Sequence, residues 1–128
     1  MTSPRRTALL LAGWTVFVWT TRIRNVLGDD SLDGGAKAGR VALSLSFTAL
    51  AGLVVWAALR HGDRLRPAVL LLAGWTVGVW VVRSVGIARG GHSAAFVVVH
   101  LVLAAVSIGL CWVAVRAPHR FSASAAKN

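Results

Sequence analysis

An apolar segment occurs twice in the chain: Leu9–Arg22 reads LLLAGWTVFVWTTR, and Leu70–Arg83 reads LLLAGWTVGVWVVR. Eleven of the fourteen positions are identical, at a constant offset of 61 residues. The identities include two tryptophans, a glycine, a threonine and an arginine, so the low complexity of apolar sequence does not explain them. The repetition predicts a tandem duplication, with unit one at residues 8–60 and unit two at residues 68–116.

The overall composition indicates a membrane protein. The chain has 128 residues, enough for a single domain over residues 1–128, and 56% of them are hydrophobic. The mean hydropathy is +0.69. A soluble protein of this size has too little interior to bury so much apolar surface, whereas a lipid bilayer accepts it. We therefore expect the bilayer to be the main partner of this chain.

Four apolar runs of about 20 residues are separated by short segments rich in glycine, aspartate and serine. At a rise of ~1.5 Å per residue, each run is long enough to cross a hydrocarbon core of ~30 Å as a helix. The start of the first run resembles a signal peptide, but Arg22-Ile23-Arg24 stands where a cleavage site would be expected, so we expect a retained helix. The runs cover residues 8–27, 38–59, 68–88 and 94–115 and predict an all-α, polytopic membrane four-helix bundle.

The two units are expected to be parallel. Each contains two spans, so both units begin on the same side of the membrane, and their symmetry axis lies along the membrane normal. The second spans of the units agree more weakly. Their Trp-x-x-x-Arg ends, at Trp56 and Trp112, align at an offset of 56, which pairs Ser44 with His100.

The charge pattern predicts a topology. The formal net charge is +10, but the basic residues lie mostly at the ends of apolar runs, so nucleic-acid binding is not expected. The two termini and the middle loop hold eight of the 14 Lys and Arg residues. The other two connections, counted with their adjoining helix ends, hold six, and Arg22, Arg40 and Arg83 of these lie inside the spans. This bias places both termini, including a short basic tail at residues 117–128, on the cytoplasmic side of the plasma membrane.

Few residues could support catalysis. All four acids (Asp29, Asp30, Asp33 and Asp63) lie outside the apolar runs, so no span contains a carboxylate for acid–base chemistry. His92 and His100 are eight residues apart, about 12 Å along a helix, which is too far to share a metal. Cys111 is the single cysteine. We therefore predict no catalytic residue, no metal and no cofactor.

Arginines inside the apolar runs are the candidate site. Arg22 and Arg83 lie about five residues inside the ends of their spans, and an intramembrane charge is costly. On a helical wheel each shares a face with a tryptophan and a threonine of its own segment. The predicted site is an outer-leaflet cavity that binds an anion or a lipid phosphate; its candidate residues are Arg22, Arg83, His100, Arg40, Ser44, Thr15, Thr76 and Trp80.

Two other interpretations of these arginines stay open. They could reach the membrane surface as interfacial anchors, each stabilised by a cation–π contact with the tryptophan three residues earlier. Alternatively, the aspartates of residues 29–33 could fold onto them as counter-charges. Small residues at Gly13, Gly74 and Gly78 further predict close helix packing and, through one of these faces, a homo-oligomer.

The segments GWTVFVWTTRIRN (13–25), GWTVGVWVVR (74–83) and AAFVVVHLVLAAVSIGL (94–110) resemble a group of small, uncharacterised four-span membrane proteins of high-GC actinobacteria. The resemblance implies the same fold and no particular activity. Three functions are left. The first is a non-catalytic accessory or scaffold bundle that binds another membrane protein. The alternatives are binding or transport of an anion or anionic lipid head group, and a lipid-modifying membrane enzyme.

Overall fold

The computed structural model describes residues 3–117. Over that range the chain is all-helical, as predicted, and forms four α-helices and one short 3₁₀ helix. The elements are α1 (Pro4–Leu27), α2 (Gly34–Arg60), η1 (Gly62–Arg64), α3 (Leu65–Arg89) and α4 (Ala94–Arg116). Apart from Ala117, the predicted basic tail at residues 117–128 lies outside the described residues.

Polar residues in the connections end the helices, as their turn chemistry predicts. Ser3, Asp33 and Ser93 precede α1, α2 and α4, and each side chain accepts a hydrogen bond from the backbone N–H three residues later. Such caps satisfy N–H groups that the first helical turn leaves without a partner. Gly91 has a φ of 65°, a left-handed conformation that glycine adopts at no steric cost, and it completes the turn between α3 and α4.

By length and composition, three helical stretches of residues 3–117 are apolar enough to cross a membrane. They are α2, the stretch Gly62–Arg89 that ends with α3, and α4. Helix α1 is of similar length but less apolar, because it carries four arginines and four threonines. The architecture fits a membrane protein, and a fourth span through α1 stays a prediction.

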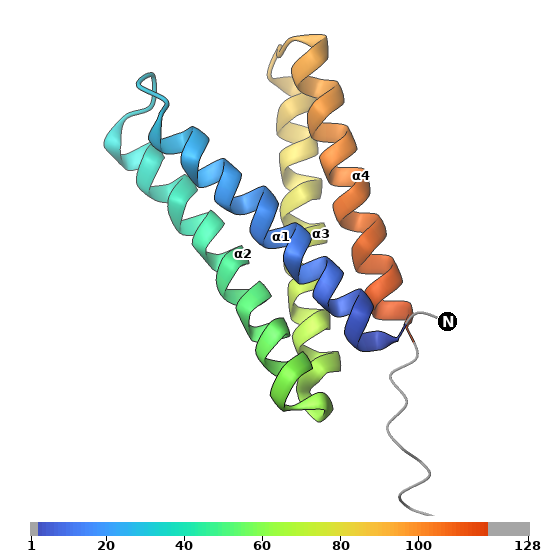
Figure 1. Ribbon diagram of the computed structural model, residues 1–128. Coiled ribbons are helices and arrows are strands. Elements are labelled where there is room, and N and C mark those ends of the chain that lie inside the picture. The colour runs from blue at the N-terminus through green and yellow to red at the C-terminus, as the bar shows by residue number, and fades with distance from the viewer. Residues whose placement is uncertain (1–2, 118–128) are drawn as a thin grey trace, which may run out of the picture.

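The helices form two antiparallel hairpins, α1–α2 and α3–α4 (Figure 1). Between the hairpins, α1 contacts α4 and α2 contacts α3. The hairpins lie close together at the end that carries the N-terminus and η1. They diverge toward the opposite end, where residues 28–33 join α1 to α2 and residues 90–93 join α3 to α4 (Figure 1). The bundle is therefore open between its two hairpins at this loop end.

Alanines, aliphatic side chains such as Leu11 and Leu72, and aromatic rings fill the core. Alanines at positions such as 8, 12, 51 and 57 are fully buried and let the helix backbones approach closely. Phe47 of α2, also fully buried, stacks on Trp19 of α1 with ring centroids 3.9 Å apart. Its ring lies 6.1 Å from that of Trp75 on α3, so Phe47 joins the two hairpins. Because lipid tails are as apolar as leucine, such packing, and not the hydrophobic effect, holds membrane helices together.

Two tryptophan–serine hydrogen bonds also connect the hairpins. Trp14 Nε1 on α1 donates to Ser107 Oγ on α4 at 2.9 Å. Trp75 Nε1 on α3 donates to Ser46 Oγ on α2 at 3.0 Å. The two donors are 61 residues apart, and so are the two acceptors. Each hairpin therefore donates one bond to the other at corresponding positions.

Loss of one of these bonds is expected to weaken the bundle measurably. Trp14→Phe and Trp75→Phe keep an aromatic ring but remove the N–H, and each should lower the free energy of unfolding by about 0.6–1 kcal/mol, the usual worth of an interhelical hydrogen bond in a membrane. The measurement is the SDS mole fraction at the unfolding midpoint in mixed micelles. Trp112→Phe is the control, because Trp112 is exposed and makes no such bond. Equal unfolding midpoints for all three variants would contradict a stabilising role of the two tryptophan–serine hydrogen bonds.

Candidate functional site

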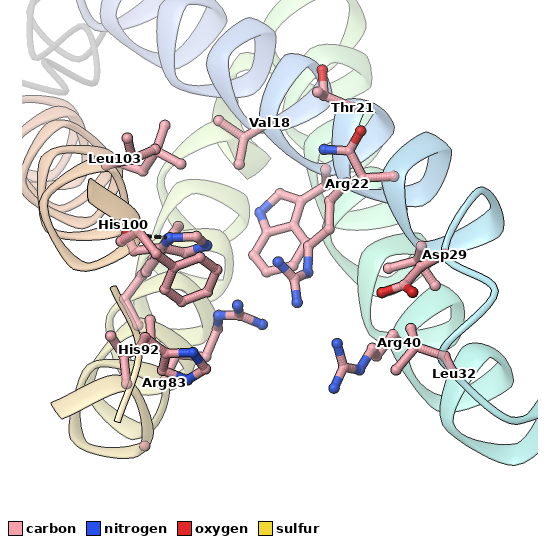
Figure 2. A pocket seen from close by; sticks show the side chains of 18 of the residues that line it. Val18, Thr21, Arg22, Asp29, Leu32, Arg40, Arg83, His92, His100 and Leu103 are labelled. Atoms are coloured by element: carbon pink, nitrogen blue, oxygen red, sulfur yellow. Dashed lines mark hydrogen bonds between the residues drawn. The ribbon is translucent and has the colours of Figure 1, made fainter. Parts of the chain in front are cut away.

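A cavity of about 700 Å³ lies between the diverging hairpins at the loop end of the bundle. All four helices contribute to its lining. Arg22, Arg40 and Arg83, from α1, α2 and α3, provide its positive charge, and we refer to it as the arginine cavity. Figure 2 shows the three guanidinium groups directed into the same opening. The structure thus brings together five of the eight predicted site residues, namely these three arginines, Trp80 and His100.

Arg22 and Arg83 are positioned by the repeated segment. Each follows by three residues a tryptophan that is almost fully buried, Trp19 or Trp80, and the rings of this pair lie 6.2 Å apart. A helical turn separates each tryptophan from its arginine, so burial of the ring aims the guanidinium toward the space between the hairpins. The arginines therefore line the cavity between the two hairpins.

The predicted cation–π contacts form in one repeat unit only. Arg83 Cζ lies 5.9 Å from the centroid of the Trp80 ring. In the other unit Trp19 is stacked on Phe47, and in residues 3–117 Arg22 makes no corresponding contact.

Three buried N–H donors at the arginine cavity lack an acceptor within residues 3–117. They are Arg22 Nε, Arg83 Nε and Trp80 Nε1. A buried donor without a partner costs about 1–3 kcal/mol, and more when it is charged. Arg22 is also repelled by Arg83 and Arg40. The cavity consequently favours a ligand that has several acceptor oxygens and a negative charge.

Asp29 interacts electrostatically with Arg40, but within residues 3–117 no loop carboxylate forms an ion pair with Arg22 or Arg83. Asp29 lines the cavity, but its carboxylate accepts hydrogen bonds from the hydroxyl and the backbone N–H of Ser31. These two bonds hold the pKa of Asp29 below its ordinary value and keep it ionised. Asp33 caps α2 through Ala36. Within residues 3–117, Arg22 and Arg83 form no ion pair, and three arginines against one aspartate leave the cavity a formal charge of +2.

A column of stacked rings forms the α4 side of the cavity. His92, Phe96 and His100 are spaced four residues apart, and their ring centroids are 4.4 Å and 3.9 Å apart in succession. His100 Nδ1 lies 2.8 Å from the Phe96 carbonyl oxygen, so the proton is on Nδ1 and Nε2 is left for other partners. Phe96 separates the two histidines, and no group of three potential metal ligands occurs in the described part of the chain.

Three predicted site residues lie elsewhere. Thr15, Thr76 and Ser44 are buried in the helix packing and do not line the cavity. Thr15 donates its hydroxyl hydrogen to the Leu11 carbonyl oxygen at 2.8 Å, and Ser44 donates to that of Arg40 at 2.9 Å. Such bonds to the carbonyl four residues earlier satisfy a hydroxyl within its own helix. These residues are part of the core.

The predicted equivalence of Ser44 and His100 also fails. Ser44 is fully buried, whereas His100 is partly exposed at the cavity. The two tryptophan–serine bonds pair Ser46 of α2 with Ser107 of α4 at an offset of 61 residues, and the buried positions of the two helices agree with this offset to within one residue, for example Ala51 and Cys111. The alignment through Trp56 and Trp112, at 56 residues, is therefore wrong by about one helical turn.

Gly13, Gly74 and Gly78 do not mediate helix packing within residues 3–117. All three are exposed, and a Cβ atom added at any of them would meet nothing within 4 Å. Close packing through these faces requires a second chain, so the predicted homo-oligomer stays a proposal.

Several cavity residues were not predicted from the sequence. Asn25 and His92 lie at or near helix ends, and a helical wheel drawn for one span does not cover the neighbouring loop. Asp29 was predicted only as a possible counter-charge to the arginines. The spacing of Phe96 and His100 could have revealed part of the α4 side of the cavity, because residues four apart share a helix face.

Comparison with protein families, curated proteins and solved structures finds no match for this chain. The fold and the site define the class: a small helical bundle of membrane type with an arginine-lined cavity between two hairpins. Function is therefore inferred from the geometry and chemistry of the cavity itself.

Proposed function

We propose that this chain is a four-span membrane protein that binds an anion, of the phosphate type, in the arginine cavity. The observation that carries the proposal is the set of three buried donors, Arg22 Nε, Arg83 Nε and Trp80 Nε1, which have no acceptor within residues 3–117. A phosphate has several oxygens on one centre, and its charge opposes the mutual repulsion of the arginines. Arginine binds such groups in bidentate geometry, so two guanidinium groups can share one phosphate.

The proposal includes a duplicated architecture and a topology. Two parallel two-helix repeats account for the offset of 61 residues that relates the two tryptophan–serine bonds between the hairpins. The basic residues favour cytoplasmic termini, so the loops at residues 28–33 and 90–93 lie outside. The arginine cavity, at the same end of the bundle, then belongs to the outer leaflet of the plasma membrane.

A second candidate is a non-catalytic accessory bundle that binds another membrane protein or a second copy of this chain. The observation in its favour is the open glycine face of α3, where Gly74 and Gly78 are exposed one helical turn apart. The two functions are compatible, because this face and the arginine cavity use different residues of α3.

Anion binding is expected to depend on Arg22. The wild-type protein in uncharged detergent is titrated with glycerol 3-phosphate by calorimetry. Arg22→Ala should weaken binding about 10–100-fold, because a hydrogen bond to a charged group contributes ~1.5–3 kcal/mol. The matched control is Arg24→Ala, since Arg24 lies two residues along the same helix, is exposed and does not line the cavity. Equal affinities for the two variants would refute the proposed site.

A further inference from the structure

One side of the arginine cavity is lined by apolar residues, which a site for a free anion would not require. Phe17 and Val18 of α1 and Val99 and Leu103 of α4 are among the residues that line it. Phe17 is 62% exposed and Val99 is 55% exposed. Residues that line the cavity therefore also belong to the outer apolar surface of the bundle. In a membrane, this side of the cavity is continuous with the acyl chains of the surrounding lipid.

The size of the cavity also exceeds the needs of a free anion. Its volume of about 700 Å³ is within the ~300–1,000 Å³ typical of pockets for whole small molecules. A phosphate ion has only five non-hydrogen atoms and would contact the arginines while leaving the apolar wall uncovered. The occupant that matches both parts is an amphiphile with an anionic end and a hydrocarbon end.

The depth of the arginines suits a lipid head group. Arg22 lies five residues before the end of α1, about 7–8 Å below the loop. The loops at this end carry Asp29, Asp30 and His92, polar groups expected at the membrane surface. A lipid phosphate entering between α1 and α4 has to descend only about one and a half helical turns to reach Arg22.

We infer that the ligand of the arginine cavity is an anionic phospholipid, whose phosphate binds Arg22 and Arg83 and whose acyl chain lies between α1 and α4 against Val99. The inference rests on the proposed anion-binding function and specifies its ligand. A zwitterionic lipid is a poorer match, because its ammonium group would add positive charge to a cavity that already has a formal charge of +2.

The test separates the lipid from the free anion. Wild-type protein, Val99→Trp and Val98→Trp are reconstituted in nanodiscs that contain equal amounts of phosphatidylglycerol and phosphatidylcholine. The co-purifying lipid is counted by native mass spectrometry after transfer to detergent. Val99→Trp fills the apolar side of the cavity. Val98→Trp is the matched control, because Val98 is 58% exposed, adjacent in the same helix and not part of the lining. Binding of glycerol 3-phosphate to all three proteins is measured in parallel.

We expect wild type and Val98→Trp to retain phosphatidylglycerol in preference to phosphatidylcholine. Val99→Trp should retain at least tenfold less phosphatidylglycerol, while the affinity of Val98→Trp for glycerol 3-phosphate stays within twofold of wild type. Retention of phosphatidylglycerol by Val99→Trp, or equal retention of the two lipids by wild type, overturns the lipid inference and leaves the anion site intact. If wild type binds neither glycerol 3-phosphate nor phosphatidylglycerol, the anion site and the lipid inference both fall.

Discussion

Replacing Phe47 with alanine is expected to lower the free energy of unfolding by about 3 kcal/mol, the largest effect among single core substitutions in this bundle. Phe47 is fully buried, stacks on Trp19 at 3.9 Å and lies 6.1 Å from Trp75. Truncation removes these contacts and leaves a cavity where α2 meets both α1 and α3. Phe→Ala costs ~3–5 kcal/mol in soluble cores. The lower end applies here because lipid contributes no hydrophobic transfer term between helices.

The measurement is unfolding in SDS mixed micelles, with Phe17→Ala as the matched control. Phe17 is 62% exposed, so its truncation exchanges contacts with lipid or detergent and should change stability by less than about 0.5 kcal/mol. Because Trp19 also lines the arginine cavity, Phe47→Ala should weaken anion binding as well. A Phe47→Ala variant as stable as Phe17→Ala would show that the two hairpins are not joined through this ring.

The helices were predictable because membrane physics leaves few choices. Apolar runs of about 20 residues must be helical in lipid, since each backbone group needs a partner within its own segment. Polar residues between the runs then mark the ends, and Ser93 caps α4 as its position suggests. Helix α1 is the least clear case, because its arginines and threonines lower its apolar character without preventing the helix.

The site was predicted in part, and the errors have a common origin. A helical wheel gives the direction of a side chain, which was right for Arg22 and Arg83. A helical wheel does not show at which depth along the bundle the two hairpins cease to contact each other. Thr15 and Thr76 share a face with the arginines but lie about two turns lower, where the helices are still packed. The second spans have too few distinctive residues to align, so the register of Ser44 and His100 could not be obtained without the structure.

The double variant Arg22→Met/Arg83→Met is expected to be more stable than the wild type without ligand and to bind no anion. Both arginines are partly buried, their Nε atoms have no acceptor within residues 3–117, and the charges of Arg22, Arg83 and Arg40 repel one another. Methionine keeps much of the side-chain volume and removes the charge. Replacing buried ionic groups by apolar residues often stabilises a protein by ~1–4 kcal/mol, and we expect about 1–2 kcal/mol here. Glycerol 3-phosphate affinity should fall more than about 100-fold, since two charge-assisted contacts are lost.

The sign of the stability change distinguishes a ligand site from a structural charge network. If loop aspartates neutralised the arginines, the double variant would be destabilised, because it would leave carboxylates without partners. The matched control is Arg24→Met/Arg89→Met, which removes two exposed arginines from the last turns of the same helices. This control should be slightly less stable than wild type, because cations favour helix C-termini, and should bind normally. A ligand at 100 times its dissociation constant stabilises the folded state by ~2.7 kcal/mol. Thermal unfolding with and without glycerol 3-phosphate should therefore show this gain for the wild type and for the control. The double variant should show no ligand-dependent gain. A double variant that is destabilised without ligand, or that keeps the ligand-dependent gain, would contradict a function based on these arginines.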